Sequence, residues 1–133
     1  MKTKKPDTAF LARPRAVQTE NLLDQTAIAD LRTLSSSGQG SLLQEVVSLF
    51  LENAPQRVAQ ISQSVNDAPM LAFHAHALKS MSLNLGAKRI IELSQKLEDL
   101  GRTRNVHGAP ALVRELEAAY LQTRAQLVAL RGR

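Results

Sequence analysis

His76, Lys79 and Ser80 are the residues whose types and spacing first suggest chemistry. An imidazole can act as a nucleophile or carry a proton near neutral pH. Lys79 and Ser80 follow it by three and four residues, the positions that adjoin it on a helix surface. A cation beside an exposed imidazole favours an anionic partner. This group therefore predicts a docking site for something anionic.

A helical wheel places the two histidines of this segment on different sides. At about 100° per residue, His76 lies about 160° from Leu78, the centre of an apolar stripe. His74 falls on that stripe, so we expect it at the core boundary and His76 on the outward face. Phe73 and Leu83 lie before and after His76 on this face. From spacing alone, an ordinary surface histidine near a few apolar side chains is the more common interpretation.

The sequence lacks the motifs of an enzyme that binds ATP or a metal. It contains no Cys, and His74, His76 and His107 do not have the spacing of metal ligands. A Gly-rich phosphate-binding loop is missing, and so is an Asp cluster that would hold Mg²⁺. We therefore expect no enzyme activity and no cofactor or metal site in this chain.

The elements that must position these residues are predicted to be helices. The chain is 44% hydrophobic but only 3% aromatic, a composition typical of helical bundles. Asp24 is the expected N-cap of a first helix, in which Ile28 and Leu34 recur at helical spacing. Residues 35–40 are predicted to form a loop, and Ser41 to begin a long second helix.

Proline and glycine mark the limits of the remaining helices. Pro55 is expected to kink the second helix or divide it in two. A third helix should run from the N-cap Asp67 to about Leu85 and end at Gly86, followed by a fourth over 87–102 and a fifth from Pro110. We therefore predict an all-α fold, an antiparallel, up-and-down four-helix bundle with a short N-terminal cover helix.

Domain organisation and location follow from charge and hydropathy. Residues 21–133 are predicted to form this one domain, and residues 1–20 to be a flexible basic leader or linker. The first 15 residues carry a net charge of +4 out of the total of +5, so the rest is nearly neutral and we expect no nucleic-acid partner. The apolar runs are far too short to span a bilayer, and no signal-peptide core is present. We expect a cytoplasmic, monomeric domain without membrane contact.

The segment from His76 to Ala87, HALKSMSLNLGA, resembles a family signature. It is similar to the H-x-L-K-G-x-x-x-N-L-G-A motif of histidine-containing phosphotransfer (HPt) domains, the phosphorelay modules of two-component signalling. The segment LFLENAP at 49–55 is similar to the helix before the family's active helix, and the resemblance extends from Leu23 to the last predicted helix. Ser80 is a departure, because the family usually has a glycine there that lets a partner approach the helix closely.

The resemblance implies that His76 accepts a phosphoryl group from a receiver-domain aspartate and passes it to another receiver. Glu98 occupies the position of the family's Gln or Glu that orients the histidine, and Lys79 would offset the phosphoryl charge. For Glu98 and Arg102, an exposed pair one helical turn apart is the structural alternative. Supporting and partner-docking roles are expected at Phe73, Ser80, Leu83, Gln95 and Arg102.

The implied partners are response-regulator receiver domains and a histidine kinase. The receiver would supply the Mg²⁺ that phosphoryl transfer requires. The alternative is a helical adaptor or degenerate HPt domain that binds receivers without phosphotransfer. The sequence leaves open whether the domain stands alone or is the terminal module of a hybrid, membrane-anchored sensor kinase. It also leaves open the cognate receivers, the signal and the direction of phosphoryl flux.

Overall fold

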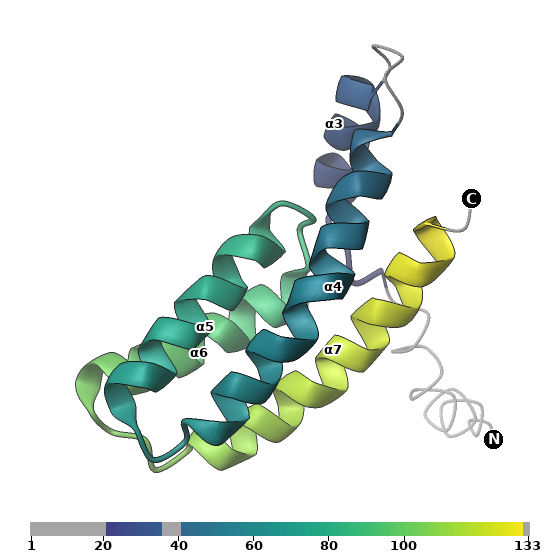
Figure 1. The fold of residues 1–133 in the computed structure, drawn as a ribbon. Coiled ribbons are helices and arrows are strands. Elements are labelled where there is room, and N and C mark those ends of the chain that lie inside the picture. The colour runs from purple at the N-terminus through teal and green to yellow at the C-terminus, as the bar shows by residue number, and fades with distance from the viewer. Residues whose placement is uncertain (1–20, 36–40, 132–133) are drawn as a thin grey trace, which may run out of the picture.

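The structure, a computed structural model, describes residues 21–35 and 41–131. This part folds into α3 (Gln25–Ser35), α4 (Leu42–Gln63), α5 (Ala68–Leu83), α6 (Lys88–Thr103) and α7 (Ala109–Arg131). Helices α4 to α7 alternate in direction and form an up-and-down bundle, and α3 packs on α4 at one end (Figure 1). The predicted all-α bundle with a cover helix is therefore confirmed. The predicted leader at 1–20 and most of the predicted loop lie outside the described residues.

The predicted capping residues begin three of the helices. The side-chain oxygens of Asp24, Ser41 and Asp67 each accept a hydrogen bond from a backbone N–H two or three residues further along the chain. The three distances are 2.8, 3.0 and 3.2 Å. Gly86 has a φ of 60°, the left-handed conformation expected of a glycine that follows a helix. The residues that were predicted to limit helices therefore mark the starts of α3, α4 and α5 and the turn that follows α5.

Three details depart from the sequence predictions. Of the two alternatives for Pro55, division of the second helix is wrong, since α4 runs unbroken from Leu42 to Gln63. Helix α5 ends at Leu83, earlier than the predicted Leu85, because a tight turn precedes Gly86. Leu34 and Leu49, which have the spacing of core positions, are 63% and 53% exposed.

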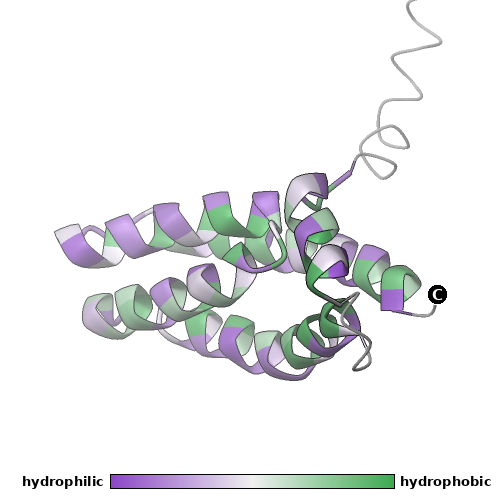
Figure 2. Cartoon of the chain, turned by 90° about the horizontal axis from the view of Figure 1, so that it is seen from above, coloured by the Kyte–Doolittle hydropathy of each residue, from purple (hydrophilic) through white to green (hydrophobic). Residues whose placement is uncertain are grey.

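The core lies between the four bundle helices and is mostly aliphatic, with hydrophilic residues concentrated on the outer sides of the helices (Figure 2). Leu71 and Leu78 of α5 are fully buried in it. Each such leucine contributes about 1.5–3 kcal/mol when it leaves water. This burial fixes the rotation of α5 about its axis, and therefore turns His76 outward.

Helices α5 and α6 form the most extensive helix pair, and Gly101 allows their close approach. A Cβ atom at this buried position would lie 2.6 Å from the carbonyl oxygen of Ala68 and 2.7 Å from the backbone nitrogen of Ala72. Only glycine lets the two backbones come this close. The contact holds the preceding turn of α6, which carries Glu98, against α5.

Gly101→Ala is therefore expected to lower the free energy of unfolding, by up to about 2 kcal/mol. Overpacking against backbone costs about 1–3 kcal/mol, which exceeds the roughly 1 kcal/mol by which alanine is the better helix former. Gly108→Ala is the matched control, because no atom lies within 4 Å of its added Cβ. Urea denaturation of the two variants measures the difference. A Gly101→Ala variant as stable as the wild type would contradict the close-packing argument.

Candidate functional site

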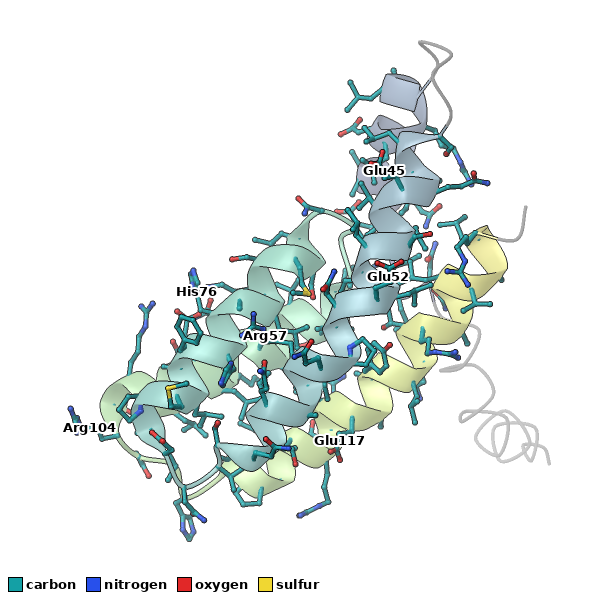
Figure 3. The ribbon with its side chains drawn as sticks, in the orientation of Figure 1. Glu45, Glu52, Arg57, His76, Arg104 and Glu117 are labelled. Carbon is teal, nitrogen blue, oxygen red and sulfur yellow. The ribbon has the colours of Figure 1, made fainter. Side chains whose placement is uncertain are left out.

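His76 lies in the middle of α5 with its imidazole at the surface, on the outer side of the helix (Figure 3). Its side chain is 54% exposed. His74 is only 8% exposed. The opposite placement of the two histidines, predicted from the helical wheel, is confirmed.

Glu98 reaches His76 from α6. Its Oε2 lies 3.0 Å from Nδ1 of the imidazole, and the Glu98 side chain is only 1% exposed. Because a carboxylate can only accept, Nδ1 must carry the proton and donate it. In the neutral form of the ring, the other nitrogen, Nε2, is then the one with the lone pair. The interpretation of Glu98 as part of an exposed surface pair is wrong, since its carboxylate is buried between the helices.

Two cations bind the same carboxylate. Lys79 Nζ lies 2.9 Å from Oε1 of Glu98 and also donates to Oε1 of Gln95 at 2.8 Å. The Arg102 guanidinium, on a side chain that is 64% exposed, contacts Oε2 of Glu98. Glu98 is therefore surrounded by His76, Lys79 and Arg102. With a neutral imidazole, these four side chains have a formal net charge of +1.

The contacts decide the ionisation of Glu98. Burial by itself would raise its pKa, but hydrogen bonds from Lys79 and His76 and the charges of Lys79 and Arg102 outweigh burial and hold the pKa below its usual value. The carboxylate is thus ionised at neutral pH. It remains an acceptor there, so the proton stays on Nδ1 of His76.

A shallow hollow lies beside the imidazole. It is lined by Pro69, Ala72, Phe73, His76, Ala77 and Arg102. Phe73, whose side chain is 60% exposed, forms its apolar border. The hollow is open to a molecule that approaches His76 from solvent, with an apolar side chain at one edge and a guanidinium at another.

The predicted site residues fall into two groups. His76, Lys79, Gln95, Glu98 and Arg102 form one contact network between α5 and α6. Phe73 borders the hollow, whereas Ser80 and Leu83 are exposed on α5 without a described contact to the network.

Comparison with known proteins identifies the fold and the family. The model of the Hpt domain family matches residues 45–126, more than half of the chain. The chain belongs to the Hpt domain family. Histidine-containing phosphotransfer protein 2 of Arabidopsis thaliana is 22% identical to this Hpt domain over 103 residues, which cover 74% of the chain and 66% of that protein. The chain therefore spans just under two thirds of this relative's length.

A solved structure shows the same fold. The crystal structure of histidine-containing phosphotransfer protein B (HptB) from Pseudomonas aeruginosa PAO1 matches this Hpt domain with a TM-score of 0.77. The match covers 86% of this chain and 97% of that chain at 22% identity. None of the helices described for the Hpt domain is long and apolar enough to cross a membrane.

Sequence reasoning missed three features of this Hpt domain. It did not find that Lys79 is held by Glu98 and Gln95, that Gly101 permits the helix contact, or that Arg57 hydrogen-bonds His74. The spacing of Gln95, Glu98 and Arg102 by three and four residues was a usable signal, because it places them on one face of a helix. A mid-helix glycine was a signal for close packing. Nothing local in the sequence connects Arg57 with His74.

Proposed function

We propose that this Hpt domain is a phosphorelay intermediate. His76 accepts a phosphoryl group from the phospho-aspartate of a response-regulator receiver domain and passes it to the aspartate of another receiver. One observation carries the proposal: the exposed imidazole of His76 has its Nδ1 held by a buried, ionised glutamate, which leaves Nε2 free to attack.

The transfer step follows from this geometry. The Nε2 lone pair of His76 attacks phosphorus, an N–P bond forms, and the P–O bond to the aspartate breaks and releases the carboxylate. The proton on Nδ1 stays in place, so the phosphorylated ring gains a positive charge. Glu98, in contact with Nδ1, stabilises that charge and keeps the ring in one orientation. The reverse step delivers the group to a second receiver.

The cations around Glu98 offset the charge that arrives. A phosphoryl group adds about −1.5 to −2 charges at neutral pH, against a formal charge of +1 on the unmodified cluster. Lys79 has three N–H donors, and only two contacts of its amine, to Glu98 and Gln95, are described. We expect the third donor to bind a phosphoryl oxygen. The exposed Arg102 is placed to contribute a second cation.

In this proposal the chain carries the phosphoryl group, and the partner binds the metal ion. Mg²⁺ would be held by acidic residues of the receiver domain and neutralise the phosphoryl oxygens from the other side. Phe73, Ser80 and Leu83, all exposed on α5, would contact the receiver around His76. The relay would operate in the cytoplasm with this domain as a monomer, in a free protein or as part of a hybrid sensor kinase.

The decisive experiment uses receiver domains labelled with acetyl [³²P]phosphate. A panel of them is incubated with the wild-type chain and Mg²⁺, and transfer of label is followed on gels. We expect the chain to take label from at least one receiver, with the acid-labile, alkali-stable behaviour of an N–P bond. Binding to receivers without any transfer of label would favour the adaptor function instead.

A further inference from the structure

A groove between α4 and α5 contains a single charged side chain. Its lining residues are Val46, Leu49, Phe50, Asn53, Gln56, Arg57, Gln60, Met81 and Asn84. Arg57 is the one charged residue among them. The guanidinium lies between the two helices, on the α4 side of His76 (Figure 3).

Exposed apolar side chains lie on the two helices that form this groove. Large hydrophobic side chains are exposed on α4 and α5 at Leu49, Met70, Phe73 and Leu83, whereas the described residues of α6 contribute none. The α6 side of His76 instead carries the charged network around Glu98. A protein that docks over His76 would therefore bury apolar surface mainly along α4 and α5, and cover Arg57 with it.

Arg57 is held in place from two directions. Its Nη1 lies 2.8 Å from Nδ1 of His74, and its guanidinium lies 5.9 Å from the centroid of the Phe73 ring. A guanidinium only donates, so Nδ1 of His74 accepts and the buried imidazole is neutral. Phe73 packs edge-on to His74 and also borders the hollow beside His76. The cation is therefore positioned next to the candidate site by two rings of α5.

We propose that Arg57 selects the docking partner by pairing with a carboxylate on an otherwise apolar element of the receiver domain, and that neutral His74 positions Arg57 for this contact. The inference rests on the proposed function, because it assumes that receivers dock over His76. A partner without the carboxylate would bury the guanidinium unpaired, which is strongly unfavourable. The groove thus discriminates between receivers of similar shape by one charge.

Protonation of His74 would make the contact between Arg57 and the receiver carboxylate depend on pH. Burial, and then the charge of Arg57, hold the pKa of His74 below its ordinary value of about 6.5, against the opposing charge of Asp67 at the start of α5. No charged side chain of α6 contributes among the described residues. Protonation would turn Nδ1 into a donor and repel Arg57. Since the pKa is lowered, docking is expected to persist through neutral pH and to weaken only as pH falls below that ordinary value.

The test measures binding of the receiver that transfers best in the labelled panel. Arg57→Ala is expected to weaken its dissociation constant about tenfold or more, and Arg57→Lys to recover only part of this. Arg89→Ala is the matched control, because it also removes one cation but lies in an exposed ion-pair group with Glu92 and Glu115. His74→Asn retains an acceptor near the place of Nδ1 and cannot titrate, so its binding should lose the decline at acid pH that the wild type shows.

Phosphoramidate, a small phosphodonor that needs no docking, separates the two proposals. Arg57→Ala should take phosphoryl from phosphoramidate as the wild type does, which also shows that the variant is folded. Equal effects of Arg57→Ala and Arg89→Ala on receiver binding, or identical pH profiles of wild type and His74→Asn, would overturn the inference and leave the proposed function standing. A wild-type chain that takes no label from any receiver would overturn both.

Discussion

His76→Gln is expected to abolish phosphoryl acceptance, with labelling reduced at least about a thousandfold and below detection. Glutamine offers no lone pair on a ring nitrogen, and removal of a nucleophile is the most severe single change a transfer site can undergo. The side chain is 54% exposed, and Lys79 and Arg102 still contact the Glu98 carboxylate when the imidazole is lost, so the substitution should lower the free energy of unfolding by no more than about 1.5 kcal/mol. Transfer of label from a phosphorylated receiver, beside a urea unfolding curve, measures both quantities.

The other two histidines test the specificity of this result. His107 is exposed in the turn before α7, so His107→Gln should be labelled like the wild type. His74→Asn should still be labelled by phosphoramidate, because the inner imidazole is buried and its Nδ1 is engaged with Arg57. Label that persists in His76→Gln would show that another residue is the acceptor.

Periodicity was sufficient to predict the fold and the placement of His76. Apolar residues at helical spacing gave the number and order of the described helices, and side-chain caps such as Asp67 gave the starts of three of them. The wheel of α5 placed Leu78 in the core and His76 outside, because one helix with a single apolar stripe has only one way to face a bundle. Apolar spacing, capping and the outward side of a helix are properties of a single segment, so the sequence of that segment is enough to predict them.

The chemistry between helices could not be predicted in the same way. An exposed pair with Arg102 was the alternative for Glu98, yet the carboxylate is buried, because Gly101 lets α6 approach α5 and because three donors surround it. Arg57 and His74 meet only when α4 packs on α5. Such contacts depend on interhelical distance and rotation, which no local pattern specifies. The motif supplied the identity of Glu98 as a partner of His76, but not its burial or its ion pairs.

Lys79→Ala is expected to slow phosphoryl transfer about five- to a hundredfold. A charge-assisted contact to a developing anion at a partly solvated site contributes about 1–3 kcal/mol. Lys79 lies one helical turn from His76, and only 19% of its side chain is exposed. We therefore expect that neither water nor another side chain takes the place of its amine in the variant. Single-turnover transfer from a phosphorylated receiver measures the rate. Lys96→Ala is the control, because it removes one cation from the exposed surface of α6, and its rate should stay within about twofold of the wild type.

Lys79 also contacts Glu98, so its loss could act on the ring of His76 instead of on the phosphoryl group. The two routes are separable. Glu98→Ala removes the acceptor of Nδ1–H, and ¹⁵N NMR should then show that part of the His76 population has moved its proton to Nε2, where it blocks attack. Water can replace part of the lost contact, so the rate should fall less than in Lys79→Ala.

In Lys79→Ala, Glu98 still accepts from Nδ1, so the tautomer should stay as in the wild type while the lifetime of the phosphorylated form changes. A tautomer shift of the same size in both variants would show that Lys79 acts through Glu98 and not on the phosphoryl charge.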